Sequence, residues 1–155
     1  MNQESGRSLI EIIGVLAIAG VMSVATFGLY NMIADDLNQK DAERVLQGIA
    51  ENTKLLWQPR GTYEGVSVDA LKENKVPDSE RAPIGGETWS ITASADGQSF
   101  SINVVDLNYS DCEYFSIKKM DWANAVVVNG IESLPSGTSD NCFKTTTNQI
   151  SFIVE

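Results

Sequence analysis

The sequence predicts an α+β protein in which a long N-terminal helix packs on a small antiparallel sheet. Residues 8–57 contain no proline and keep apolar side chains at helical spacing. After them, two β-rich runs flank Asp96 and Gly97, a pair typical of hairpin turns. The predicted strands are residues 89–94, 99–107, 125–128 and 150–154. A chain of 155 residues has room for one such helix and one modest domain.

The first half of the helix is apolar enough to span a membrane. No charged side chain occurs from Ile12 to Ala34. These residues, at about 1.5 Å each, make a helix of roughly 34 Å, against a hydrocarbon core of about 30 Å. A cleaved secretory signal would have a shorter apolar region, of about 7–15 residues, and a basic segment before it. We therefore expect this helix to stay in the protein.

Glu11 lies at the front edge of the apolar stretch, between Ile10 and Ile12. An acidic residue at the centre of a membrane helix costs about 2.5–3.5 kcal/mol, and less near an end. A buried carboxylate becomes tolerable when a cation pairs with it. The position therefore predicts a cationic partner for Glu11.

The second half of the helix, residues 35–57, is amphipathic. Pro59 and Gly61 are expected to end it. Its expected buried face is Ile33, Leu37, Val45, Ile49 and Leu56, and its polar positions are Asp36, Lys40, Glu43, Gln47 and Glu51.

Beyond the helix the elements are short. Ser110 and Glu113 have the spacing of a capping box and predict a helix over residues 111–120. Asn129 and Gly130 are expected to end a buried strand. The remaining expectations are a short helix at 68–74, a loop at 134–141, and a core that includes Trp57, Trp89 and Trp122.

The composition argues against several functions. The formal charge is −10, from 11 basic and 21 acidic residues, whereas binding nucleic-acid phosphates requires a basic surface. A local basic groove formed on assembly, for example at Lys118 and Lys119, is the exception left open. The chain has no histidine, which excludes imidazole zinc sites and Ser-His-Asp triads.

A membrane-anchored enzyme is an alternative that rests on carboxylates. Ser94 and Ser99 have no histidine base to activate them. The candidate acids and bases are Asp69, Glu73, Asp78 and Glu80; the scattered aspartates Asp106, Asp111, Asp121 and Asp140 lack the spacing of a calcium loop. We expect no catalysis, no metal ion and no cofactor.

The start of the chain resembles the type III signal of type IV prepilins, through Gly6-Arg7-Ser8-Leu9-Ile10-Glu11 and the apolar helix that follows. The resemblance implies that a prepilin peptidase cuts between Gly6 and Arg7 and methylates the new N-terminus at Arg7. Glu11 would then meet the N-terminal amine of a neighbouring subunit during assembly. The chain departs from the family in two ways: Arg7 replaces the usual apolar residue, and the leader has Glu4 but no Lys or Arg.

The rest of the chain resembles the type IVb pilins, especially those of conjugative thin pili. The matching features are Tyr63-Glu64-Gly65, Val76-Pro77, Trp89, Cys112, Val128-Asn129-Gly130, Cys142 and the strand after Asn148. The resemblance implies the pilin fold. Its parts would be a leader at 1–6, a transmembrane and filament-core half-helix at 7–34, an amphipathic half at 35–57, and a head domain at 58–155.

The two cysteines, Cys112 and Cys142, fit an oxidising compartment beyond an outward-facing membrane segment. A bridge between them would bound the loop 112–142 and contribute roughly 3.5–4 kcal/mol of stability. Two free buried thiols are the alternative.

The function implied by the resemblance is structural. The subunit would be held in the inner membrane, processed, and polymerised by the assembly machinery into an extracellular filament of identical copies. Such filaments serve adhesion, cell contact, conjugation or motility, through a receptor on a recipient or host cell. Small residues such as Gly14, Gly20 and Gly28 would let neighbouring helices approach closely. A pseudopilin of a type II secretion system is the alternative, although major pseudopilins usually lack this cysteine pair and carry a calcium site.

Overall fold

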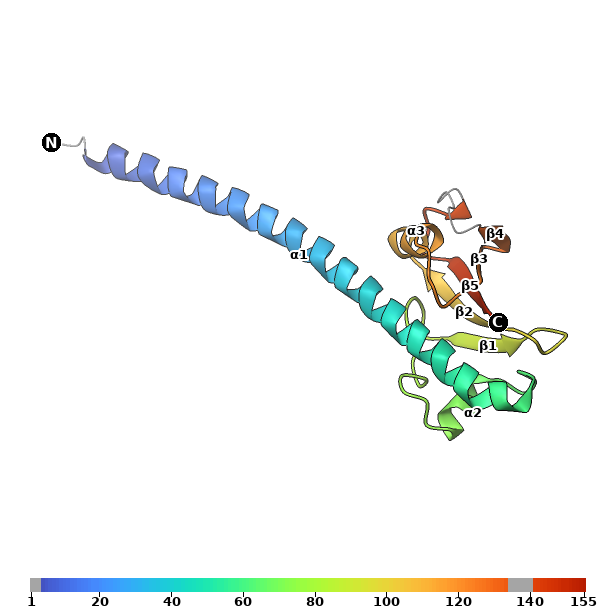
Figure 1. Cartoon of the computed structure of the whole chain (residues 1–155). Coiled ribbons are helices and arrows are strands. Elements are labelled where there is room, and N and C mark those ends of the chain that lie inside the picture. Colours follow the sequence, from blue (N-terminus) through green and yellow to red (C-terminus); the bar gives the residue numbers. More distant parts are fainter. Residues whose placement is uncertain (1–3, 134–140) are drawn as a thin grey trace. The chain divides into compact units, whose positions relative to one another are not determined.

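The computed structural model describes residues 4–133 and 141–155 (Figure 1). Residues 1–3 of the expected leader, and residues 134–140 of the expected loop, lie outside the described residues. The chain divides into two compact units, Met1–Asn38 and Gln39–Glu155, each of which is described by itself.

A single helix, α1, runs from Glu4 to Trp57. It begins four residues before the predicted start and ends at the predicted residue. The end has a local cause, because Pro59 lies in the 3₁₀ turn η1 (Gln58–Arg60) and cannot continue the α-helical hydrogen bonds. Gly61 then takes a left-handed conformation, with φ 74°, and donates its N–H to the Gln58 carbonyl at 3.0 Å.

The second unit contains a five-stranded antiparallel sheet in the order β1-β2-β5-β3-β4 (Figure 1). The strands are β1 (Trp89–Ala93), β2 (Phe100–Leu107), β3 (Ala125–Val128), β4 (Ile131–Ser133) and β5 (Asn148–Val154). The hairpin predicted at Asp96 and Gly97 is present between β1 and β2, so this prediction is confirmed. Strand β4 was not predicted: Asn129 and Gly130 have φ values of 51° and 83°, typical of a two-residue hairpin turn, so the chain returns instead of leaving the sheet.

One face of the sheet is buried against helices. On β5 the alternating residues Asn148, Ile150, Phe152 and Val154 are buried. They share a core with α2 (Val68–Glu73), with α3 (Tyr109–Ile117) and with residues 39–57 of α1. The buried stripe of α1 is Gln39, Ala42, Leu46, Ile49, Ala50, Thr53 and Trp57. Trp89 and Trp122 are half-buried against the core, while Trp57 is fully inside it.

The predicted apolar face of the amphipathic half-helix was correct in part. Ile49 is fully buried, and Val45 and Leu56 pack against the core, whereas Ile33 and Leu37 are 58% and 59% exposed. The buried stripe follows spacings of three and four and includes two polar residues. Both polar side chains are hydrogen-bonded, Gln39 Nε2 to Asp111 Oδ1 at 3.0 Å and Thr53 Oγ1 to the Ile49 carbonyl at 2.7 Å. Burial is therefore tolerable for them.

Helix α3 also differs from its prediction. Its N-cap is Asn108, whose Oδ1 accepts the Asp111 N–H at 2.8 Å, so Ser110 lies inside the first turn and is not the cap. The helix ends at Ile117 rather than at Met120, because Lys118 adopts an extended ψ of 122°. Strand β3 is half-buried, with Val128 its one fully buried residue. Helix α2 matches its prediction to within one residue.

Gly85 and Gly86 pack closely against β2 where that strand is irregular. The alternation of β2 breaks between Val104 and Leu107, where Asp106 has φ 57°. The Gly86 N–H donates to the Val105 carbonyl at 2.9 Å. A Cβ on Gly85, which has φ 85°, would lie 2.2 Å from that same oxygen. No other residue fits this contact without a shift in the backbone.

Candidate functional site

The first unit presents a continuous apolar surface. The large apolar side chains of α1 from Leu9 to Leu37 are all exposed, from 56% at Ile12 to 75% at Val24. By length and composition this helix can cross a membrane. Soluble monomers rarely expose so much contiguous apolar surface. Lipid or other protein molecules must therefore cover it.

Two hydroxyl groups in this surface are hydrogen-bonded within the helix. Ser23 Oγ donates to the Ala19 carbonyl at 2.8 Å, and Thr26 Oγ1 donates to the Met22 carbonyl at 2.7 Å. Such back-bonding lowers the cost of placing a hydroxyl where no water is present. These two side chains are therefore compatible with apolar surroundings.

Glu11 is an exposed carboxylate near the start of this surface. It lines a shallow hollow of about 280 Å³ with Ile12, Val15 and Leu16. Among the side chains described, from residue 9 to 132 and from 141 to 155, none pairs with it. Gly6 and Arg7 lie in the first turns of α1, one turn before it. Cleavage between Gly6 and Arg7, methylation of Arg7 and the assembly role of Glu11 stay predictions.

The glycines of the apolar helix face open space. A Cβ added to Gly14, Gly20 or Gly28 would meet no described atom within 4 Å. The expected close packing at these positions would involve other molecules and stays a prediction.

The bridge Cys112–Cys142 is present, with its Cα atoms 5.9 Å apart. It ties α3 to the segment that leads into β5. Cys112 is fully buried and Cys142 is half-buried. The disulfide prediction is confirmed, and the alternative of free thiols is wrong.

A buried asparagine, which sequence reasoning missed, holds the same segment. Asn148 is fully buried. Its Oδ1 accepts the Phe143 N–H at 2.7 Å and the Asn129 Nδ2 at 3.0 Å, and its Nδ2 donates to the Phe143 carbonyl at 2.9 Å. Asn129 Nδ2 also donates to the Asn141 carbonyl at 2.7 Å. The signal in the sequence was the alternation of β5, which places Asn148 on the same face as Ile150.

The surface at Lys118 and Lys119, where a basic groove formed on assembly was left open, is of mixed charge in the single chain. Lys118 Nζ pairs with Glu43 Oε2 and lies 2.8 Å from the Tyr114 hydroxyl. The hydrogen bond with Glu43 raises the pKa of Lys118. The hollow beside it, of about 530 Å³, is also lined by Glu51 and Asp121. Its charges therefore do not form a continuous basic surface.

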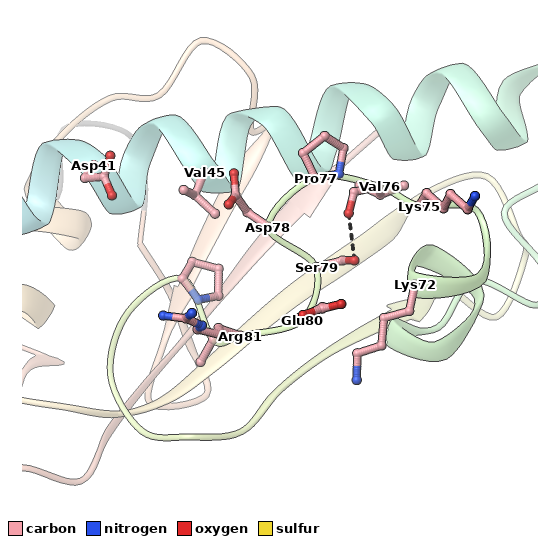
Figure 2. Close-up of a pocket in the computed structure, with 12 residues that line it drawn as sticks. Asp41, Val45, Lys72, Lys75, Val76, Pro77, Asp78, Ser79, Glu80 and Arg81 are labelled. Atoms are coloured by element: carbon pink, nitrogen blue, oxygen red, sulfur yellow. Dashed lines mark hydrogen bonds between the residues drawn. The ribbon is translucent and has the colours of Figure 1, made fainter.

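A groove of about 600 Å³ lies between α1 and the segment 72–83 (Figure 2). Asp78 and Glu80 line it together with the cations Lys72, Lys75 and Arg81. The buried Ser79 hydroxyl donates to the Val76 carbonyl at 2.8 Å. The four candidate catalytic carboxylates, Asp69, Glu73, Asp78 and Glu80, are all solvent-exposed.

The candidate nucleophiles have a structural role. Ser94 Oγ lies 2.6 Å from Asp96 Oδ1 in the β1–β2 turn, and this bond lowers the pKa of Asp96. The Ser99 N–H donates to Ser94 Oγ at 3.0 Å. Within residues 4–133 and 141–155, no group of three potential metal ligands comes together. The arrangement supports a turn rather than a reaction.

Comparison with known proteins identifies the fold. The chain is similar to the crystal structure of TcpA, a type IV pilin from Vibrio cholerae El Tor biotype, with a TM-score of 0.57 and 15% sequence identity. The match covers 77% of this chain and 99% of that chain. No family model and no curated protein matches the sequence. The likeness shows that the chain has the fold of a type IV pilin, a long N-terminal helix with a small antiparallel sheet, as the sequence predicted.

Proposed function

We propose that this chain is a pilin, a structural subunit that polymerises into a filament on the cell surface. One observation carries the proposal: in a chain with the pilin fold, the large apolar side chains of α1 from Leu9 to Leu37 are exposed in the part of the chain that the structure describes. The membrane covers this surface before assembly, and neighbouring helices cover it in the filament. Polymerisation replaces lipid contacts with protein contacts along the same residues.

Glu11 couples this replacement of lipid contacts by protein contacts to the pairing of charges. Prepilin peptidase cleaves between Gly6 and Arg7, and the new N-terminus is methylated at Arg7. Its amine then supplies the cation for Glu11 of a neighbouring subunit. An unpaired carboxylate in apolar surroundings costs a few kcal/mol, and docking of the next subunit relieves that cost. The sequence features that resemble those of the type IVb pilins support assignment to that group and a role in cell contact, including conjugation.

The test is intact mass and N-terminal sequencing of protein sheared from the cell surface. The wild-type material is expected to begin at Arg7. Gly6→Ala is expected to leave full-length protein in the membrane. Glu11→Ala is expected to be processed normally but not to appear on the surface.

A matched control is Glu51→Ala, which removes an exposed carboxylate from the same helix outside the apolar stretch. Its surface polymer is expected to match wild type. Wild-type protein that keeps Met1 and remains a membrane monomer would overturn the proposal.

A further inference from the structure

Asn129 and Gly130 form the turn between β3 and β4, and they are the one Asn-Gly pair in the sequence. A glycine, which has no side chain, leaves its nitrogen free to attack the side chain of the asparagine before it. The Gly130 nitrogen bonds to Cγ of Asn129, the Cγ–Nδ2 bond breaks, and the side-chain nitrogen leaves as ammonia with the proton of the glycine N–H. Water then opens the cyclic imide to aspartate or isoaspartate. The pair therefore has the chemistry of a deamidation site.

The folded chain gives a partner to every polar atom of the Asn129 side chain. Nδ2 donates to the Asn141 carbonyl at 2.7 Å and to Asn148 Oδ1 at 3.0 Å. Oδ1 accepts the Gln149 N–H at 2.9 Å. The backbone of the same residue is held as well, since the Asn129 N–H donates to the Gln149 carbonyl at 2.9 Å. Both ends of the amide group are therefore fixed.

These bonds oppose formation of the imide ring. To reach the Gly130 nitrogen, Cγ of Asn129 must turn toward its own main chain, and Oδ1 and Nδ2 must leave their three partners. One of those partners, Asn148, is fully buried, and a polar group that loses its partner in a buried site is costly. Water is not the limiting reactant, because Gly130 is exposed and Asn129 is half-buried.

The two acceptors of Nδ2 lie at the two ends of one segment, residues 141–148. The bridge from Cys142 to Cys112 ties the start of this segment to α3. Asn148 holds it from inside, where its Oδ1 accepts the Phe143 N–H at 2.7 Å. Detachment of this segment removes both acceptors from the Asn129 amide at once.

We propose that Asn129-Gly130 is a deamidation site that the fold keeps closed and that opens when residues 141–148 detach. An aspartate at position 129 has no hydrogen to donate to the Asn141 carbonyl or to Asn148 Oδ1. An isoaspartate adds a carbon atom to the main chain of a two-residue turn, whose geometry depends on its length. Released ammonia does not return, so a molecule that has reacted cannot restore the original turn. The site is a permanent record of this opening.

The first test compares native with reduced and denatured wild-type protein, full-length and in detergent, at mildly alkaline pH. Mass spectrometry of the peptide that contains residue 129 measures conversion of the amide to a carboxyl group. The native protein should react more slowly by about tenfold or more, because the reaction must wait for local opening. Asn124, which precedes Ala125, is the control within the same chain and should react slowly in both states. Equal rates at Asn129 in the two states would overturn the proposal.

The second test removes one acceptor. Asn148→Ala should raise the rate at Asn129 in the folded protein by about tenfold or more, since the segment then opens more often. Gln149→Ala is the matched control: it keeps the backbone groups that bond to Asn129 and should react at the wild-type rate. The unfolding midpoint in detergent shows whether each variant is folded. A folded Asn148→Ala protein with the wild-type rate would overturn the proposal.

A third measurement uses wild-type protein alone and decides the question if Asn148→Ala does not fold. Hydroxylamine attacks the cyclic imide and cuts the chain between Asn129 and Gly130. Without denaturant, protein whose Cys112–Cys142 bridge has been reduced should be cut, whereas oxidised protein should resist. The cut lies inside the bridged loop, so the samples are compared after a final reduction that separates the two pieces. Equal cutting of the oxidised and reduced proteins would overturn the proposal.

Discussion

The two units of this chain use the same helix in opposite ways. In the first, residues 9–38 form a helix whose side chains are all exposed except the half-buried Ala34. In the second, residues 39–57 of that helix bury a stripe in a core with the sheet, α2 and α3. Hydrogen bonds along the backbone are the same in both. The difference is that the second unit contains its own packing partners, whereas the first requires partners outside the chain.

This contrast shows that helix formation and tertiary stability are separate requirements. A helix in water gains most of its stability from packing rather than from propensity. On the proposed function, the first unit depends on lipid or on other copies for its stability, whereas the second unit has a core of its own. Substitutions of the same type should therefore have a large effect on unfolding in the second unit and little or none in the first.

The largest contrast is expected between two phenylalanines. Phe152 is fully buried and contacts the rings of Phe115 and Trp122, with centroids 5.7 and 5.2 Å away. Phe152→Ala should lower the free energy of unfolding of the second unit by about 3–5 kcal/mol. Phe27, which is 71% exposed, is the matched control: Phe27→Ala should leave that unfolding unchanged. Denaturant titration of full-length protein in detergent measures both, and equal effects would contradict the division into two units.

The second largest change in stability is expected from loss of the Cys112–Cys142 bridge. Replacing Cys112 and Cys142 together by Ala should destabilise the second unit by about 3.5–4 kcal/mol, because the unfolded chain regains the freedom of a loop of about 31 residues. Reductant should give the same shift in the wild type and none in the double variant. The helical content of the first unit, followed by hydrogen exchange, should not change. A double variant with wild-type unfolding would show that the bridge adds nothing to stability.

Substitution of Asn148 tests how much one buried side chain contributes to the stability of the second unit. Asn148→Ala should cost about 2–3 kcal/mol, since it leaves the Phe143 N–H and neighbouring carbonyls without partners in a buried site. Gln149→Ala, the adjacent exposed residue, should change stability by less than about 0.5 kcal/mol. Hydrogen exchange at the Phe143 amide should speed up in Asn148→Ala alone. Slow exchange there in the variant would mean that the bridge by itself holds the segment.

The smallest effect is expected at the pair Glu43–Lys118. A double-mutant cycle with Glu43→Gln and Lys118→Met should give a coupling of about 0.2–1 kcal/mol, reduced by salt, because both side chains are partly exposed. The hydrogen bond with Glu43 raises the pKa of Lys118 above its ordinary value of 10.5. The coupling should therefore be fully present below about pH 10.5 and be lost as the pH rises through the higher folded-state value. A coupling that grows at alkaline pH would contradict this assignment.

Elements with strong local signals were predictable from the sequence. Pro59 and Gly61 act directly on the backbone, so the end of α1 at Trp57 was predicted to the residue. The hairpin at Asp96 and Gly97 was predictable for the same reason, because these residues also act directly on the backbone. Strand β4 was missed because three residues are too few for a periodic pattern, and Asn129-Gly130 can either end a strand or turn it back.

Features that depend on tertiary partners were not predictable in the same way. Gln39 is buried because Asp111, far along the chain, accepts its hydrogen bond, and no local pattern contains that information. The cap of α3 was misassigned because Asn108 and Ser110 are both good caps, and the chain geometry after β2 selects the first. In the candidate site, the sequence alone located the apolar surface and Glu11, whereas the Asn148 network required the fold.

The position of β5 has a consequence for the order of events during synthesis. Strands β1 and β2 form one half of the sheet, β3 and β4 form the other, and β5 alone joins them. Residues 148–154 leave the ribosome last among the described strands, so the sheet remains in two separate halves until these residues have emerged. The apolar segment has emerged long before that point. Membrane insertion of the helix would therefore precede folding of the sheet, which completes only after the ribosome has made the strand at its centre.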